Sequence, residues 1–261
     1  MKSVRPAEGP IRVLHVDDDE AFLRLTQTSL TEVDSEIHLR QTIDPTAVLD
    51  RIGSESVECV VSDYQMPGLT GVDLLGRVRE SYPRLPFVLF TGQGSEQVAS
   101  EAISAGVTDY VSKGSGLEGF ELLATRIRGA VEQRRVERAL EETRESYERL
   151  LETAPDAILV VDAESGRLLE VNTAAEELFG RPREELRGLH QTELHPEDDR
   201  GYYVDVFEEH AESSGVIRDD RDLVVVHAEG HEIPVEINAA TIEFGDRRVV
   251  QAIFRDLRGR T

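Results

Sequence analysis

Five side chains in the first half of this chain have types and positions that suit phosphate chemistry. The acidic pair Asp17 and Asp18 follows a short apolar segment, and Asp63 follows another. Thr91 and Lys113 come at the ends of two later segments. Three carboxylates held together repel one another unless a cation joins them, and oxygen ligands suit a hard ion such as Mg²⁺. A carboxylate beside a metal ion, a lysine and a hydroxyl can act as a nucleophile towards a phosphoryl group, because the other groups neutralise the transferring oxygens.

Short strands must position these side chains. Five apolar segments alternate with segments of helical spacing, which indicates an α/β fold with a doubly wound, five-stranded parallel sheet. The carboxyl ends of such strands meet at one edge, where open α/β folds bind ligands, so the five side chains should gather there. The predicted strands are residues 11–16, 37–39, 57–61, 86–90 and 109–113.

The segments between the strands carry the end signals of helices and turns. Asp44 and Pro45 are typical of a helix start, and Gly53 is typical of its end. Pro67 and Gly68 cannot continue the strand that leads to Asp63, so a turn is expected there. The predicted helices are residues 21–31, 45–52, 72–81, 96–105 and a long one from about 117.

The net charge of −23 comes from 52 acidic and 29 basic residues. Only Lys2 and Lys113 are lysines, so 29 − 2 leaves 27 arginines. An acidic surface poor in lysine resembles that of proteins from salt-loving archaea; the alternative is an ordinary acidic protein from a GC-rich genome. In both cases the charge argues against nucleic acid as a partner, because that needs a basic surface.

The length of 261 residues predicts one or two domains. No apolar run has the length of a membrane span and the N-terminus has no apolar signal region, so we expect a cytoplasmic protein without a membrane partner. The single cysteine, Cys59, excludes an internal disulfide and a cysteine-based metal cluster. Its position inside a predicted strand favours a small buried hydrophobe.

The constellation resembles the receiver domain of two-component response regulators over residues 11 to about 130. The family pattern is an acidic pair after the first strand, Asp-x-x-Met-Pro-x-x-x-Gly after the third, Thr or Ser after the fourth and Lys after the fifth. The family usually continues with proline, whereas Gly114 stands here, and glycine permits a similar turn. The matching residues are Asp17-Asp18, Asp63-Tyr64-Gln65-Met66-Pro67-Gly68-Leu69-Thr70-Gly71, Thr91 and Lys113.

This resemblance implies that Asp63 is the phosphoacceptor. It implies that Asp18, Asp63 and the Gln65 backbone carbonyl bind Mg²⁺, with Asp17 acting partly through water. The phosphoryl donor would be a sensor histidine kinase. We expect no enzymatic activity of the chain's own, beyond removal of its own phosphoryl group.

The resemblance also assigns roles around the phosphoryl group. Lys113 and Thr91 would contact it, and Thr91 and Tyr110 would form a switch pair that rearranges on phosphorylation. An arginine could not place a compact point charge as Lys113 does.

Residues 120–154 contain no proline and only one glycine, which predicts one long helix. Apolar or small residues recur at alternating spacings of four and three, which is a heptad seam. Two interpretations stay open: an amphipathic helix that lies on its own domain, and a parallel dimeric coiled coil that relays a signal between domains. We prefer the second. The seam residues are Val136, Leu140, Thr143, Tyr147, Leu150 and Ala154.

After Pro155 the pattern changes to that of an α+β fold with an antiparallel sheet. A hairpin turn is expected at Gly245 and Asp246. The predicted strands are residues 157–161, 168–171, 217–226, 232–242 and 247–255, and the predicted helices are residues 172–180, 183–186 and 197–212.

This half resembles a PAS domain from about residue 146 to 257. A flavin–cysteine adduct would need a cysteine here, and haem would need a histidine, for which the candidates are His190, His195 and His210. We favour a small-molecule pocket, or a contact surface without any ligand. The matching residues are Asp156-Ala157-Ile158, Glu170-Val171-Asn172, Ala175, Phe179-Gly180, His195-Pro196-Glu197-Asp198, Gly230-His231-Glu232-Ile233-Pro234-Val235-Glu236 and Arg255-Asp256.

These observations predict a response regulator that signals by protein interaction through its PAS domain. The expected parts are a receiver at residues 1–118, a linker helix at 119–150 and a PAS domain at 151–261. The linker helix and the PAS domain could also form a homodimer. The alternative is a fragment or relative of a hybrid sensor histidine kinase. A DNA-binding regulator is disfavoured, because the sequence has neither a helix-turn-helix pattern nor a basic patch.

Overall fold

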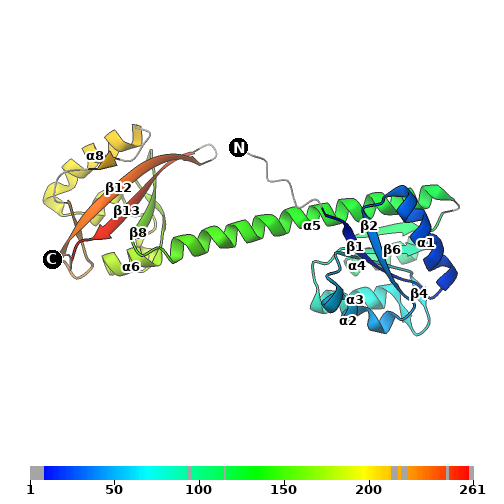
Figure 1. The fold of residues 1–261 in the computed structure, drawn as a ribbon. Helices are drawn as coiled ribbons and strands as arrows, with labels where there is room; N and C mark the ends of the chain where they lie inside the picture. The colour runs from blue at the N-terminus through cyan, green and yellow to red at the C-terminus, as the bar shows by residue number, and fades with distance from the viewer. Residues whose placement is uncertain are drawn as a thin grey trace. The chain divides into compact units, whose positions relative to one another are not determined.

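The computed structural model describes residues 9–92, 96–114, 116–212, 217–218, 223–244 and 247–258. The chain forms two compact units, Met1–Glu142 and Thr143–Thr261, and each is described by itself. The N-terminal unit contains a parallel sheet between helices, and the C-terminal unit contains an antiparallel sheet (Figure 1).

The N-terminal sheet has five parallel strands, as the alternation of elements predicts. Their order in the sheet is β2-β1-β3-β6-β7. All four residues of β3 are buried, which explains why its sequence is continuously apolar up to Ser62. The strands are β1 (Ile11–Val16), β2 (Ile37–Thr42), β3 (Cys59–Ser62), β6 (Phe87–Thr91) and β7 (Asp109–Ser112).

Helices cover both faces of this sheet. Alternate strand residues belong to two separate cores: Val61 packs with α1 and the start of α5, and Val60 packs with α2, α3 and α4. Cys59 is fully buried, as predicted, and burial raises the pKa of its thiol. The helices are α1 (Glu20–Val33), α2 (Val48–Glu55), α3 (Gly71–Ser81), α4 (Glu96–Ser104) and α5 (Leu117–Glu152).

The predicted end of the second helix at Gly53 is wrong. A 3-10 turn, Pro45–Ala47, precedes α2, and α2 runs through Gly53 to Glu55. The chain leaves the helix at Ser56, whose φ of 52° is left-handed. Glycine tolerates helical angles as well as left-handed ones, so its presence alone does not end a helix.

The turn predicted after Asp63 is present. It joins two very short strands, β4 (Gln65–Met66) and β5 (Leu69–Thr70), and Gly68 has a φ of 77°. Proline followed by a glycine of positive φ is the pattern of a type II turn. Thr70 then caps α3 through a reciprocal pair of hydrogen bonds with Asp73.

The helix α5 has 36 residues. Its first turns lie on the N-terminal unit, where Phe120, Leu123 and Ile127 are buried. Farther along, Arg138, Arg144 and other exposed arginines form ion pairs with glutamates four residues away, which support a solvent-exposed helix.

The C-terminal unit has an antiparallel sheet in the order β10-β12-β13-β8-β9, and β11 also pairs with β12. The predicted strand at 217–226 is recorded as two strands, with residues 219–222 outside the described part of the chain. The turn expected at Gly245 and Asp246 also lies outside it. The strands are β8 (Ala157–Asp162), β9 (Leu168–Val171), β10 (Ile217–Arg218), β11 (Leu223–Val226), β12 (Glu232–Phe244) and β13 (Arg247–Asp256).

In the described part of this unit, three α-helices accompany the sheet: α6 (Thr173–Phe179), α7 (Arg183–Leu186) and α8 (Arg200–Glu212). The helix predicted at 197–212 begins as a 3-10 turn, Glu197–Asp199, which leads directly into α8. Among the described residues, no helix combines the length and apolar character needed to cross a bilayer.

A single buried amide, that of Asn172, joins three elements of the C-terminal unit. Its Oδ1 accepts hydrogen bonds from the backbone N–H groups of Ile158 (2.9 Å) and Ala175 (3.0 Å). Its Nδ2 donates to the carbonyls of Leu151 and Asp156, both at 3.0 Å. Asn172 therefore caps α6 and also ties it to β8 and to the end of α5.

We expect Asn172→Ala to lower the free energy of unfolding by about 3 kcal/mol, because buried backbone groups lose their partners. Urea denaturation followed by circular dichroism measures the change. Glu177→Ala, at an exposed position in the same helix, is the control and should have little effect. Equal stability of the two variants would contradict this account of Asn172.

Candidate functional site

The carboxyl edge of the parallel sheet brings together three of the predicted site residues. The Lys113 ammonium lies 2.7 Å from Asp17 Oδ2 and 2.7 Å from Asp63 Oδ1. Asp17 is 1% exposed and Asp63 is 7% exposed, so two carboxylates share one cation in a largely buried position. Ion pairs that are withdrawn from water interact much more strongly than surface pairs.

The acidic pair divides into a buried member and an exposed one. Burial, as the largest cause, raises the pKa of Asp17, although its hydrogen bond to Lys113 acts in the opposite direction. Asp18 is exposed at the same strand end. The Asp17 carboxylate also accepts a hydrogen bond from the Asp19 N–H at 3.0 Å, which fixes the turn between β1 and α1.

The backbone around Asp63 leaves little free space. The Gln65 N–H donates to Asp63 Oδ2 at 2.7 Å, and the Gly71 N–H donates to the Tyr64 carbonyl at 2.8 Å. A Cβ added at Gly71 would lie 2.3 Å from the Asp63 carbonyl oxygen and 2.7 Å from Leu89 Cδ2. The last glycine of the motif is therefore required by the close approach of α3 to the loop of Asp63.

The remaining predicted residues lie on the two strands beyond β3. Thr91 ends β6 opposite Ser112 and is 2% exposed, whereas Tyr110 lies opposite Leu89. Burial raises the pKa of the partly buried Tyr110 hydroxyl. The Lys113 N–H donates to the Thr91 carbonyl at 2.7 Å, so the hydroxyl-bearing residue and the lysine share a backbone contact.

Gly114 stands where the receiver resemblance would place a proline after the lysine. Its N–H donates to the Ser112 carbonyl at 2.8 Å, which is a bond that proline cannot make. After Lys113, a hydrogen bond within a tight turn thus restrains the backbone, where a proline would do so through its ring.

Two aromatic side chains belong to the site although the sequence pattern does not mark them. The Lys113 ammonium lies 4.1 Å from the centre of the Phe22 ring, a cation–π geometry. His15 is fully buried, its Nε2 lies 4.0 Å from Asp17 Oδ2, and burial lowers its pKa to about 3. His15 is therefore a neutral side chain beneath the acidic cluster. In the sequence, Phe22 is one of several apolar residues in a helix, and His15 is an ordinary residue of a strand. Neither position indicates the contact with Lys113 or with Asp17.

The C-terminal unit encloses an apolar cavity of about 70 Å³ between its sheet and α8. His195 lines it, stacked on Tyr203 with ring centres 3.4 Å apart, and its Nδ1–H donates to the Val224 carbonyl at 2.8 Å. Burial lowers the pKa of His195 to about 4, so the imidazole is neutral near pH 7. Gln191 also lines the cavity. Of the other histidines considered for haem, His190 caps a 3-10 turn, and the His210 side chain lies outside the described atoms.

Comparison with known proteins follows the same division of the chain. The family model of the response regulator receiver domain matches residues 13–127, and the model of the PAS fold matches residues 145–257. The transcriptional regulatory protein FixJ of Bradyrhizobium diazoefficiens is 34% identical over 38% of this chain and 48% of its own. The chemotaxis protein CheY of Pseudomonas aeruginosa is 32% identical over 40% of this chain and 84% of its own. This chain belongs to the response regulator receiver family.

The two matched regions confirm both resemblances drawn from the sequence, a receiver domain followed by a PAS domain. Among solved structures, the PAS domain of an HTR-like protein from Haloarcula marismortui is 26% identical, with a TM-score of 0.41, over 48% of this chain and 99% of its own. The chain spans about half the length of curated relatives such as FixJ, of which it covers 48%.

The receiver site depends on the close contact at Gly71, and we expect Gly71→Ala to lower the free energy of unfolding by about 2 kcal/mol or more, because the added methyl group must displace the Asp63 loop. Denaturant unfolding measures the change. Gly76→Ala in the same helix is the matched control, since no atom lies within 4 Å of its added Cβ. Gly76→Ala should be more stable than the unchanged chain by roughly 0.5–1 kcal/mol, because alanine favours the helix more than glycine does. A stabilising Gly71→Ala would show that the contact is not restrictive.

Proposed function

We propose that Asp63 accepts a phosphoryl group from the phosphohistidine of a sensor histidine kinase. The observation that carries the proposal is the Lys113 ammonium at 2.7 Å from the Asp63 carboxylate, at the carboxyl edge of the sheet. A fixed cation beside the acceptor neutralises charge on the transferring oxygens without reorganisation during the reaction. Thr91, buried at the end of the adjacent strand β6, is the hydroxyl assigned to the same phosphoryl group.

The charge balance at this edge supports a divalent cation. With all three carboxylates ionised, Asp17, Asp18 and Asp63 contribute −3 and Lys113 contributes +1, which leaves −2. An all-oxygen donor set suits Mg²⁺, which would offset this negative charge. We assign Asp18, Asp63 and the Gln65 carbonyl to Mg²⁺, with Asp17 acting partly through water. The ion would supply electrostatic stabilisation of the phosphoryl oxygens.

The chain's own contribution to transfer is a positioned nucleophile. An Asp63 carboxylate oxygen forms a bond to phosphorus as the P–N bond of the donor phosphohistidine breaks. The imidazole nitrogen keeps the electron pair of that bond. The Gln65 N–H, at 2.7 Å from Asp63 Oδ2, holds the carboxylate in one orientation.

Phosphorylation then changes the balance between two arrangements of Thr91 and Tyr110, the proposed switch pair. The Thr91 carbonyl accepts a hydrogen bond from the Lys113 N–H, so a displacement of Thr91 acts directly on the segment that precedes α5. A covalent group that interacts differently with two states shifts their populations.

We expect Asp63→Asn to abolish labelling by radioactive acetyl phosphate with Mg²⁺, because an amide oxygen cannot form the acyl phosphate. Incorporation of label, separated by gel electrophoresis, is the measurement. Asp50→Asn, an exposed carboxylate on α2, is the matched control and should keep full labelling. Label that persists in Asp63→Asn would place the acceptor elsewhere.

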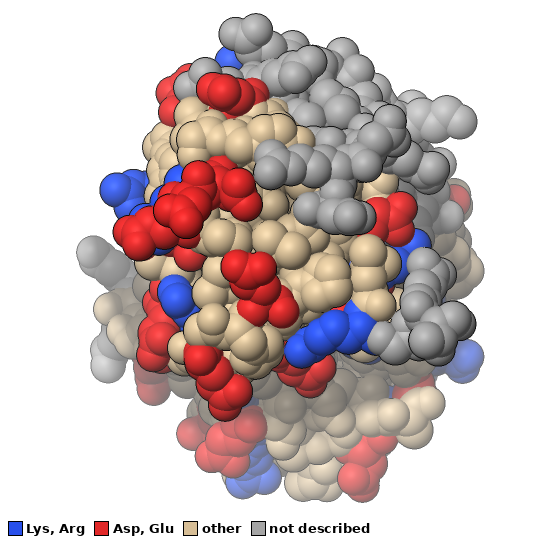
Figure 2. Space-filling model, turned by 90° about the vertical axis from the view of Figure 1, so that its left-hand side faces the viewer, with Lys and Arg blue, Asp and Glu red and all other residues tan. Residues whose placement is uncertain are grey.

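The output proposed for the phosphorylated chain is protein interaction through the PAS domain. We place the receiver at residues 1–118, the linker helix at 119–150 and the PAS domain at 151–261. Residues 153–261 hold 25 acidic and 12 basic residues, and acidic side chains are spread over the face shown in Figure 2. A partner for this face should be neutral or basic, which disfavours nucleic acid.

A second copy of the chain is the partner that the linker helix suits best. Val136, Leu140, Tyr147 and Leu150 are 53%, 70%, 53% and 71% exposed, which is unusual for residues at coiled-coil spacing. Val136 follows the buried Val131 by five residues, which turns it about 140° around the axis from the face that packs on the receiver. These four side chains therefore present exposed apolar surface that an identical helix could cover.

We expect the double change Leu140→Lys and Leu150→Lys to weaken self-association at least about tenfold, because two charges would enter the apolar seam. Sedimentation velocity over a concentration series measures the dissociation constant. Leu25→Lys with Ile43→Lys, two exposed apolar residues of the receiver, is the control pair and should associate as the unchanged chain does. If the seam variant and the parent associate equally, the dimer does not form through α5.

The haloarchaeal origin also remains a proposal. Its support is the charge of −23 together with only two lysines among 29 basic residues. Carboxylate-rich surfaces stay soluble where salt screens the repulsion between them.

A further inference from the structure

Two histidines and a glutamate meet at the hairpin between β11 and β12, outside the phosphate site and outside the PAS cavity. His227 and His231 lie opposite each other across the turn, where the His227 N–H donates to the His231 carbonyl at 3.0 Å. The Gly230 N–H closes the turn on the His227 carbonyl at 2.8 Å, and Gly230 has a φ of 87°. The hairpin geometry therefore holds both imidazoles on one side.

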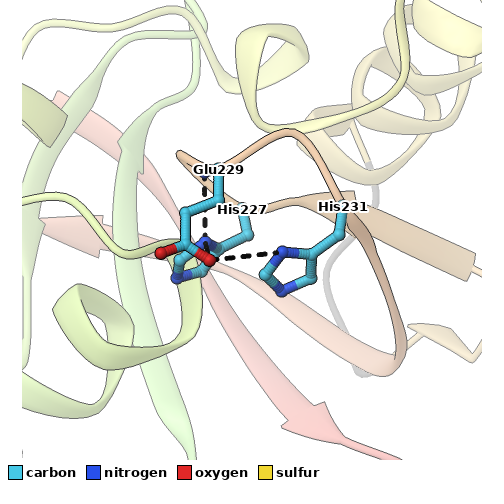
Figure 3. Close-up of side chains that lie close together, drawn as sticks. All are labelled: His227, Glu229 and His231. Carbon is cyan, nitrogen blue, oxygen red and sulfur yellow. Dashed lines mark hydrogen bonds and ion pairs between the residues drawn. The ribbon is translucent and has the colours of Figure 1, made fainter.

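The three side chains present their ligand atoms to one another (Figure 3). Glu229 Oε2 lies 3.9 Å from His227 Nδ1 and 3.8 Å from His231 Nδ1. All three atoms lie within 4.8 Å of one another, and the two rings stack with centres 4.4 Å apart. Within the described residues, this is the group of histidine and acidic side chains with the spacing of metal ligands.

His227 is held in place before any ion binds. A Cβ added at Gly180 would lie 2.1 Å from His227 Nε2, so this nitrogen faces the end of α6 and only glycine leaves room for the ring. The Glu229 N–H donates to His227 Nδ1 at 3.2 Å, which puts the ring proton on Nε2 and the lone pair on Nδ1. The Ala228 N–H donates to the Phe179 carbonyl at 2.8 Å and anchors the same turn.

The other two ligands are free to adjust. Glu229 is 79% exposed and His231 is 46% exposed, against 18% for His227. In a tetrahedral zinc site with bonds of about 2.0–2.1 Å, neighbouring ligand atoms are about 3.3 Å apart. Glu229 Oε2, at 3.9 Å and 3.8 Å from the two Nδ1 atoms, must therefore approach each of them by about 0.5 Å. The two imidazole nitrogens lie within 4.8 Å of each other and must approach by at most about 1.5 Å. Rotation of the exposed Glu229 and His231 side chains provides this approach. An ion on His227 Nδ1 takes the lone pair that accepts the hydrogen bond from the Glu229 N–H, so that weak bond is lost.

We propose that His227 Nδ1, His231 Nδ1 and Glu229 Oε2 form a binding site for a transition-metal ion of the zinc class, with water at the fourth position. Two imidazole nitrogens and one carboxylate suit Zn²⁺, Ni²⁺ or Cu²⁺ and do not suit Mg²⁺ or Ca²⁺, which prefer oxygen. The ligand chemistry therefore separates this site from the all-oxygen set of the receiver. A bound ion connects the ends of β11 and β12 and, through His227, holds the hairpin against α6.

The test is a Zn²⁺ titration of the full chain by isothermal calorimetry, with Mg²⁺ in excess to occupy the receiver carboxylates. The unchanged chain should bind one Zn²⁺ at this site. His231→Gln and Glu229→Gln should each weaken that binding at least about tenfold, since each removes one of three protein ligands. Both residues are well exposed, so neither change should disturb the fold.

Two matched variants control for charge and side-chain type. His38→Gln removes an exposed histidine of the receiver, and Glu232→Gln removes an exposed carboxylate from the same hairpin. Both should bind Zn²⁺ as the parent does. Equal binding by all four variants, or no measurable binding by the parent, would overturn the proposal.

Electron paramagnetic resonance with one equivalent of Cu²⁺ provides an independent measurement. The parent should show hyperfine coupling to imidazole nitrogen, and His231→Gln should lose part of it. The spectrum of the Glu232→Gln variant should match that of the parent. A spectrum that His231→Gln leaves unchanged would assign the bound ion to other ligands.

Discussion

The ammonium of Lys113 between the carboxylates of Asp17 and Asp63 is the interaction on which the receiver site depends. These groups come from the ends of β1, β3 and β7, and β6 separates β3 from β7 in the sheet. Buried charges are tolerated only when they are paired, so the three strand ends must keep one relative position. The Phe22 ring from α1 gives the ammonium a third partner.

Lys113 also lies close to the other elements of the proposed switch. Lys113 follows β7 directly and precedes the start of α5 at Leu117 by four residues. Its backbone N–H donates to the Thr91 carbonyl, so the cluster of Lys113 with the two carboxylates lies next to the proposed switch residue. The Gly114 N–H donates to the Ser112 carbonyl at this point, a hydrogen bond that proline could not make.

The PAS domain uses its histidines differently according to their burial. His195 is buried, stacked on Tyr203 and neutral, which suits a wall of an apolar cavity. His227 and His231 lie at a hairpin where a carboxylate faces both rings. The imidazole of His195 thus contributes packing, whereas those of His227 and His231 have ring nitrogens that face a carboxylate, because His195 is nearly inaccessible to water.

The sequence by itself determined most strands, most helices and the strand-end residues of the site, since apolar periodicity, caps and turn residues act over a few neighbouring positions. It failed at Gly53, which stays helical, and it did not mark Phe22, His15 or the grouping of His227 with His231. Only the tertiary structure decided that Lys113 reaches both carboxylates and that Gly71 must lack a side chain. The physical reason is that contacts between residues far apart in the chain depend on strand order and packing, which no local pattern contains.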